Sequence, residues 1–135
     1  GTFPTDDLRK RTKSFALHIV KLSQLLTKGR EARIIGDQLL RAGTAVAANY
    51  RAACRAPSRA EFVAKLGIVV EEADETVFWC ELLEEAGLVS RQDMNPIVNE
   101  AENFWQSSQL LGVRQDLENP DFVAARGYHL PQFIR

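Results

Sequence analysis

Four stretches of this sequence place apolar residues at alternating steps of three and four, and no stretch alternates apolar and polar residues as a half-buried strand does. Steps of three and four return to one side of an α-helix, which has about 3.6 residues per turn. The first stretch carries Leu8, Phe15, Ile19, Leu22 and Leu26 on such a stripe. The pattern predicts an all-α chain with helices near residues 6–27, 30–55, 58–86 and 90–111.

Helix-ending and helix-starting residues separate these stretches. Gly29 and Pro57 interrupt the pattern, and Ser58 with Glu61 has the spacing of a capping box. Gly87 followed by an apolar residue is typical of a Schellman C-cap. Because the connections are only a few residues long, consecutive helices are expected to be antiparallel neighbours, which predicts an up-down-up-down four-helix bundle.

The last part of the chain is different. Pro96 lies early in the fourth stretch, so that helix begins either near Ser90 or after Asn95. Residues 112–135 show no helical period and are predicted to be a C-terminal tail with at most one short helical turn. We therefore expect one bundle domain over residues 1–111, with the tail packed on another surface, a neighbouring subunit being one option.

Composition excludes several classes of protein. Two Cys in 135 residues cannot form a disulfide framework, and with 45% hydrophobic and 26% charged residues the chain is typical of one globular domain. No apolar run approaches the ~20 residues needed to span a bilayer, so we expect a cytoplasmic protein without a membrane partner. Cys54 and Cys80 lie too far apart on neighbouring helices to pair and are interpreted as small buried hydrophobic residues.

The charges are divided between the two halves of the chain. Residues 1–60 hold 12 Lys and Arg and 4 Asp and Glu, whereas residues 61–135 hold 5 and 14. Folding the helices back at Gly29 and Pro57 gathers many cations at one end of the bundle. We call this set the basic pole; its members are Arg9, Lys10, Arg11, Lys13, Arg51, Arg55, Arg59 and Lys65. Cations near a helix N-terminus oppose the helix dipole, so the pattern indicates an anionic partner, RNA or DNA.

Four acids form a second concentration of charge, which we call the acidic cluster: Glu71, Glu72, Asp74 and Glu75. The antiparallel arrangement places Arg41 level with Asp74. Ion pairing with Arg41 or with a neighbouring subunit is the favoured interpretation. The alternative is a metal-dependent nucleotide pyrophosphohydrolase that uses Glu71, Glu72 and Glu75, although the second acidic helix motif of such enzymes is missing.

No other enzymatic motif is present. His18 and His129 lack the Glu-x-x-His spacing of di-iron bundles, and neither a nucleophile elbow nor a glycine-rich phosphate loop occurs. We expect no enzymatic activity, no cofactor and no metal. Asn49 lies near the apolar stripe of the second helix and is predicted to specify register or oligomeric state. The third helix is apolar on more than one side, which favours a homo-oligomer.

Residues 32–83 carry a resemblance to a known family, most specifically in the strings QLLRAGTAVAANYRAA, FVAKLGI and EADETVFW. They resemble the bacterial four-helix-bundle proteins encoded in intervening sequences of 23S rRNA genes. The resemblance covers about residues 6–111, and Ala52 stands where the family often has Glu. The positions that match the family pattern are Arg41, Asn49, Tyr50, Arg51, Lys65, Glu72, Asp74 and Glu75.

The resemblance implies a left-handed bundle that assembles into a ring, a homopentamer, with no established catalytic residues. It implies intersubunit ion pairs or ring contacts for these eight positions, and Glu71 is a further candidate for such an ion pair. Related proteins include the accessory protein of diversity-generating retroelements, which associates with reverse transcriptase and nucleic acid. Two functions are therefore expected ahead of hydrolysis: oligomeric nucleic-acid binding through the basic pole, and a scaffold for a protein partner.

Overall fold

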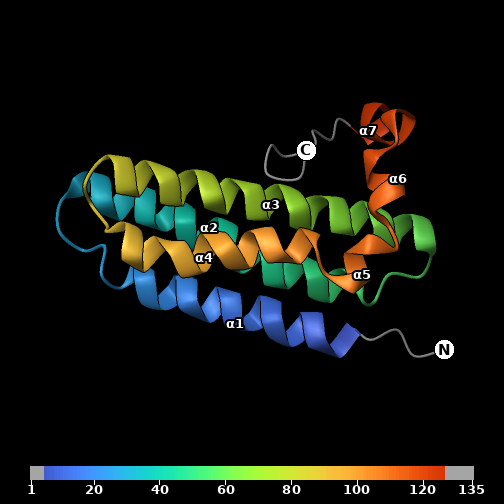
Figure 1. Ribbon diagram of the computed structural model, residues 1–135, viewed down its shortest axis with the longest axis horizontal. Helices are drawn as coiled ribbons and strands as arrows, with labels where there is room; N and C mark the ends of the chain where they lie inside the picture. The colour runs from blue at the N-terminus through green and yellow to red at the C-terminus, as the bar shows by residue number, and fades with distance from the viewer. Residues whose placement is uncertain (1–4, 127–135) are drawn as a thin grey trace.

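The computed structural model describes residues 5–126 and is helical throughout its regular structure. Four long helices, α1 (Thr5–Ser23), α2 (Arg30–Ala53), α3 (Arg59–Glu85) and α4 (Arg91–Trp105), run antiparallel to their neighbours in chain order (Figure 1). Three short helices follow: α5 (Ser108–Leu111), α6 (Arg114–Glu118) and α7 (Pro120–Arg126). They lie at the end of the bundle that holds the α2–α3 connection and the start of α1 (Figure 1). The all-α prediction is confirmed.

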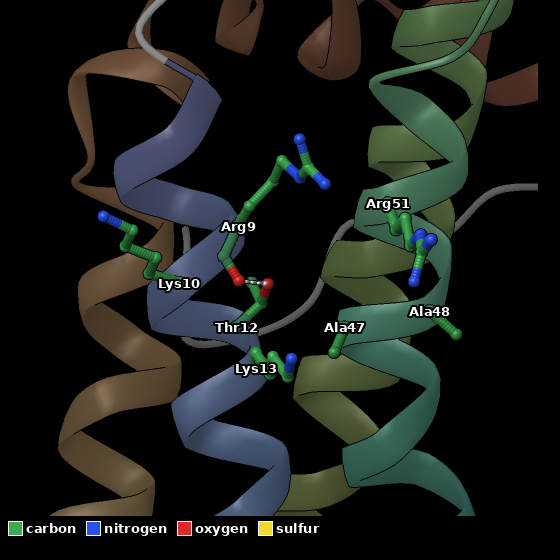
Figure 2. A pocket seen from close by; sticks show the side chains of 7 residues that line it. All are labelled: Arg9, Lys10, Thr12, Lys13, Ala47, Ala48 and Arg51. Carbon is green, nitrogen blue, oxygen red and sulfur yellow. Dashed lines mark hydrogen bonds between the residues drawn. The ribbon is translucent and has the colours of Figure 1, made fainter.

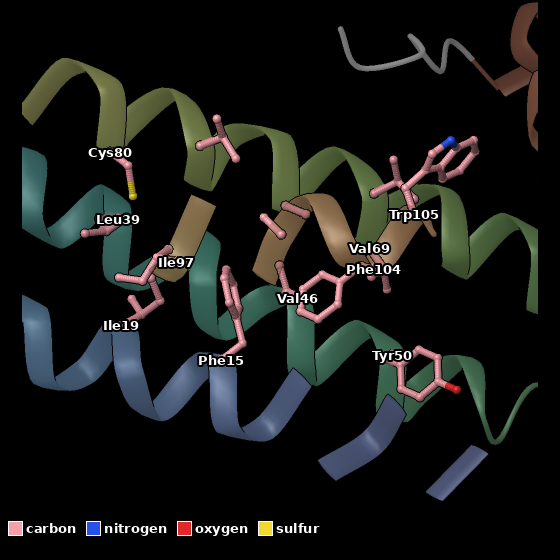
Figure 3. Packing of buried hydrophobic residues seen from close by; sticks show 14 of the residues in the cluster. Phe15, Ile19, Leu39, Val46, Tyr50, Val69, Cys80, Ile97, Phe104 and Trp105 are labelled. Carbon is pink, nitrogen blue, oxygen red and sulfur yellow. The ribbon is translucent and has the colours of Figure 1, made fainter. Parts of the chain in front are cut away.

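The predicted apolar stripes form the core. Phe15 and Ile19 of α1 face Leu39 and Val46 of α2, and the whole cluster excludes water along the length of the bundle (Figure 3). Phe104 of α4 meets Phe15 edge to face, with ring centroids 5.2 Å apart. This pair ties the last long helix to the first. Edge-to-face aromatic pairs add about 0.5–1.5 kcal/mol beyond the area they bury.

The helix ends follow the predicted signals. The Ser58 hydroxyl accepts a hydrogen bond from the Glu61 backbone N–H (3.2 Å), and Ser90 does the same for Asp93 (3.2 Å). Gly87 has φ +76°, and Leu88 N–H donates to the Leu83 carbonyl (2.9 Å), as a Schellman cap requires. The fourth long helix therefore begins at Arg91, and Pro96 lies inside it.

Two boundaries differ from the sequence-based prediction. The first helix ends at Ser23 rather than near residue 27, because Leu25 and Leu26 continue only as tight turns, with N–H groups bonded to carbonyls three residues back. Leu26 is nevertheless buried, since it packs against Gly36. The predicted helix over 90–111 is broken after Trp105, and α5 begins only at Ser108.

The predicted tail is wrong for residues 114–126, which form α6 and α7. Leu110, Val113 and Leu117 are buried in the core of the same chain, so this segment packs on its own bundle. Arg114 lies over the Trp105 ring at 4.8 Å and covers it. The remainder of the predicted tail, 127–135, lies outside the described residues. In the part of the chain that the structure describes, no helix combines the length and apolar character needed to cross a membrane.

Gly43 sets the distance between α1 and α2. A Cβ atom added there would lie 2.6 Å from Ile19 Cγ1 and 2.8 Å from Ile19 Cγ2, so the glycine allows the two helices to approach closely. A glycine inside a helix costs roughly 1 kcal/mol relative to alanine, and this contact explains its presence. The close approach also determines the shape of the groove that opens farther along the same two helices.

Candidate nucleic-acid interface

A groove of about 530 Å³ lies between the first half of α1 and the last half of α2 (Figure 2). We call it the basic groove; it is lined by Arg9, Lys10, Thr12, Lys13, Ala47, Ala48 and Arg51. Four of the lining residues are cationic and none is acidic. Concentrating one sign of charge in a concave surface raises the local potential and attracts ions of opposite sign.

Local sequence explains how the groove forms. Ala47 and Ala48 are small, so α2 leaves room opposite Arg9 and Lys13 of α1 (Figure 2). The Thr12 hydroxyl donates to the Arg9 carbonyl (3.1 Å) and is buried, so this polar group is satisfied within α1. The uncharged lining consists of Thr12, Ala47 and Ala48, and the charge of the groove lies on the Arg and Lys side chains.

Half of the basic pole lies outside this groove. Arg11 turns toward α4, where its Nε lies 3.3 Å from Glu100 Oε1 and its guanidinium lies 5.9 Å from the centroid of the Phe104 ring. It also approaches Asp7 at 3.9 Å. Arg11 thus closes the contact between the first and last long helices. Its position along the bundle predicts that Arg11 contacts nucleic acid, but in the structure its guanidinium contacts α4.

Arg59 is also engaged within the chain. Its Nη2 lies 2.9 Å from Asp116 Oδ2 and 3.3 Å from the Gly112 carbonyl, which fixes α6 against the start of α3. The sequence places Arg55 just after α2 and Lys65 on the exposed surface of α3, and neither lines the basic groove. The structure therefore brings together four of the eight predicted residues: Arg9, Lys10, Lys13 and Arg51.

The acidic cluster is paired with Arg41, as predicted. Arg41 Nη1 lies 3.2 Å from Glu72 Oε2, and the same guanidinium pairs with Glu75, not with Asp74. Asp74 lies two positions from Glu72 and so points to another side of α3. Burial raises the pKa of the Asp74 carboxyl above its ordinary value. The prediction that Arg41 pairs with the acidic cluster is confirmed, and the structure identifies Glu72 and Glu75 as its partners.

These contacts bear on the metal-dependent alternative. Glu72 and Glu75 are held by Arg41, and Glu71 is exposed on the surface of α3. Among residues 5–126 no group of three or more His, Cys, Asp or Glu side chains is placed to hold a metal ion. The geometry therefore gives no support to a pyrophosphohydrolase site at Glu71, Glu72 and Glu75.

Asn49 and Tyr50, which are adjacent in α2, differ in burial. The Asn49 amide donates to the Ala45 carbonyl (2.9 Å) within α2 and is half-buried, whereas Tyr50 is 1% exposed and belongs to the core (Figure 3). The Tyr50 hydroxyl has no hydrogen-bond partner in the described part of the chain. Burial, together with the neighbouring Cys54 thiol, raises the pKa of this hydroxyl.

The two cysteines are both free. Cys80 is buried, and burial raises the pKa of its thiol to about 12, so it behaves as a small apolar residue. Cys54 is only half-buried and lines a second cavity at the α2–α3 connection. Its interpretation as a buried hydrophobic residue was therefore incomplete.

Sequence reasoning missed the uncharged half of the basic groove, Thr12, Ala47 and Ala48. A signal was present, since two adjacent alanines on α2 come level with the cations of α1 when the chain folds back at Gly29. Small residues of α2 have two different effects here: Gly43 allows close packing on Ile19, whereas the two alanines nearer the end of the helix border the groove.

Comparisons with known proteins agree with this fold. A sequence model of the family described as 23S rRNA-intervening sequence protein matches residues 6–108. A solved structure of a protein of unknown function, from the S23 ribosomal protein family of Bacteroides thetaiotaomicron VPI-5482, is 31% identical, with a TM-score of 0.69. The match covers 82% of this chain and 98% of that chain. No curated protein matches the sequence.

Proposed function

This chain belongs to the 23S rRNA-intervening sequence protein family, and from that premise we propose that it binds nucleic-acid phosphates through the basic groove and catalyses no reaction. The observation that carries the proposal is a groove with four cations and no acid between α1 and α2. Arg and Lys recognise phosphate by charge, and backbone contacts of this kind do not depend on base sequence. Binding is therefore expected to be salt-sensitive and weakly selective for sequence.

The size of the salt effect follows from the number of cations. If all four contact phosphates, log K falls with log salt concentration with a slope of about −3, since each neutralised phosphate contributes about −0.7 to −0.9. The net charge of the chain is only −1, so the attraction is local to the groove and does not come from the whole surface.

We also propose that the protein is a homo-oligomer, a ring in which each copy repeats the basic groove. Several large apolar side chains are exposed on the single chain, including Ile34 (52%) and Phe78 (51%), and a second buried surface accounts for them. Repeating a weak phosphate site raises the overall affinity without any new contact. Light scattering coupled to size exclusion measures the subunit number, and a monomer contradicts this part of the proposal.

Charge reversal in the groove is the direct test. Arg9→Glu with Arg51→Glu is expected to weaken binding of a labelled 20-nucleotide RNA by more than about 30-fold in fluorescence anisotropy at low salt. The matched control is Lys21→Glu with Lys28→Glu, which makes the same change in net charge at exposed positions, one in the last turn of α1 and one in the α1–α2 connection. We expect the control to bind within about threefold of wild type.

Two results contradict the proposal: an equal loss in both double variants, which assigns the effect to net charge alone, or no loss in either. Turnover of a nucleoside-triphosphate panel with Mg²⁺ or Mn²⁺ contradicts the non-enzymatic part. A second candidate function is a scaffold for a protein partner, favoured by the same exposed apolar side chains. It replaces the first if the wild-type chain forms rings that do not bind RNA at low salt.

A further inference from the structure

A second cavity, of about 360 Å³, lies at the α2–α3 connection and has a different chemistry from the basic groove. Its volume falls within the ~300–1,000 Å³ typical of small-molecule sites. Most of its lining is apolar. The lining residues are Ala53, Cys54, Ala56, Pro57, Ser58, Arg59 and Phe62.

Arg59 lines one part of this cavity. Its guanidinium contacts Asp116 (2.9 Å) and the Gly112 carbonyl (3.3 Å) of the C-terminal segment. Arg59 also lines another cavity, of about 300 Å³, with Val63 and Phe122. A guanidinium neutralised by a carboxylate contributes little free charge, but its flat face still stacks on planar groups.

Phe62 provides an aromatic surface beside it. The ring is half-buried against the core and also lines the cavity. The Ser58 oxygen accepts from the Glu61 N–H, which leaves the Ser58 hydroxyl hydrogen available to donate. The cavity therefore offers an aromatic ring, a guanidinium plane and a hydroxyl donor within one small space.

The cavity and the basic groove are adjacent on α2. Arg51 lines the groove and Cys54 lines the cavity, three residues later, about 4.5 Å along the helix axis and nearly on the same side. Tyr50 lies behind both, since Arg9 and Cys54 each influence the pKa of its hydroxyl. That hydroxyl points toward the end of the bundle where the cavity lies (Figure 3). A ligand that carries both phosphate and a flat ring fits both sites at once.

We propose that the cavity takes an unpaired base of a single-stranded polynucleotide whose phosphates lie in the basic groove. This inference rests on the proposed function and adds the form of nucleic acid. A base has apolar faces and polar edges, which match the Phe62 ring, the Arg59 plane and the Ser58 hydroxyl. Bases in a duplex remain stacked on each other and cannot enter, so the cavity selects single strands over duplexes.

The experiment uses the full-length chain and short oligonucleotides that contain 2-aminopurine, a base whose fluorescence changes when it stacks. Phe62→Leu keeps the apolar volume and removes the aromatic face. We expect about tenfold weaker binding of single strands, loss of the 2-aminopurine quench, and unchanged binding of a duplex of equal length. Gln92→Ala is the control, because Gln92 is exposed near the start of α4 and lines neither the cavity nor the groove.

Arg59→Gln is a second variant, which tests the same proposal if Phe62→Leu does not fold. It removes the guanidinium plane and is expected to reduce the quench while duplex binding stays within about twofold. Thermal unfolding of each variant checks that it is folded. RNA and DNA single strands are compared in parallel, and a preference for one identifies the natural source of the ligand.

The inference is overturned if duplex and single strand bind equally, or if Phe62→Leu and Gln92→Ala bind alike with the quench intact. Either result leaves the proposed function in place, provided that Arg9→Glu with Arg51→Glu still abolishes binding. If no polynucleotide binds the wild-type chain, both the proposed function and this inference fail.

Discussion

The two sides of α2 carry the same kinds of residue in different surroundings. On the side of α3, Arg41 is paired with Glu72 and Glu75, so its positive charge is offset within the chain. On the side of α1, Arg51 shares a groove with three other cations, and no acid lines it. The comparison shows that the residues of the neighbouring helix determine whether an arginine of α2 is ion-paired or lines the groove. Its position in the sequence alone does not determine this.

On the α1 side, a substitution at Gly43, where α1 and α2 approach closely, is expected to cause the largest loss of stability. Gly43→Val places side-chain carbons where Ile19 already lies, 2.6 Å from an ideal Cβ, and should force α1 and α2 apart. We expect the free energy of unfolding to fall by about 3 kcal/mol. Denaturation in urea measures this loss.

Ala48→Val is the matched control for that change, since Ala48 is exposed on the same helix. It should cost less than about 1 kcal/mol, which is the effect of helix propensity alone. Equal losses in the two variants would show that α1 and α2 do not depend on close contact at Gly43.

The α3 side is expected to respond less. Arg41→Gln leaves Glu72 and Glu75 close together without their cation, and the free energy of unfolding should fall by about 1 kcal/mol at low salt. The loss should shrink in 1 M salt, because screening weakens the repulsion between the two carboxylates. Arg91→Gln, at an exposed pair with Glu84, should cause a smaller change. A loss that does not depend on salt would contradict an electrostatic role for Arg41.

At Asp74, the effect of burial on the stability contribution of a carboxyl can be measured separately from the effect of ion pairing in the acidic cluster. Its folded-state pKa is raised by burial, so the carboxyl favours the folded state fully below its unfolded pKa, and this contribution is lost as pH rises through the folded pKa. Asp74→Asn should therefore stabilise the protein at pH 7, by less than about 1 kcal/mol, and the gain should vanish near pH 4. Thermal unfolding across this range measures it. Destabilisation at pH 7 would instead reveal a partner for the Asp74 carboxylate.

A single neutral substitution in the groove should give the smallest effect. Lys13→Gln is expected to weaken RNA binding about threefold and to reduce the magnitude of the salt slope by about 0.7 to 0.9, with no change in stability. Lys21→Gln, outside the groove, should leave the slope unchanged. An identical slope in both variants would mean that Lys13 does not contact phosphate.

Local patterns predicted most of the fold because they report local physics. The stripe of Phe15, Ile19 and Leu22 is buried as its period requires, and the caps at Ser58 and Gly87 form as their residue types predict. The apolar period predicted the wrong end for the first helix, because Leu26 is buried against Gly36 although α1 has already ended. No glycine or proline marks the break before Ser108, so that boundary was not visible in the sequence.

The site was predicted less completely, because helix register fixes the level of a residue but not the direction of its side chain. Arg11 and Lys13 are two positions apart and were assigned together, yet Arg11 faces Glu100 while Lys13 lines the groove. Likewise Arg59 is held by Asp116, in a segment that was predicted to be a tail. The contacts of Arg11 and Arg59 both join residues far apart in the chain, which a period within one helix cannot report.

The contact of Arg11 with Glu100, 89 residues apart, also has a consequence for how the chain folds. Each of α1–α2, α2–α3 and α3–α4 is joined by a short connection, so these pairs close small loops at low entropic cost, whereas α1 with α4 closes almost the whole bundle. We expect the three sequential pairs to assemble early and the α1–α4 seam to form after the rate-limiting step. Substitutions at that seam should then mainly accelerate unfolding, so the seam governs how long each folded molecule persists.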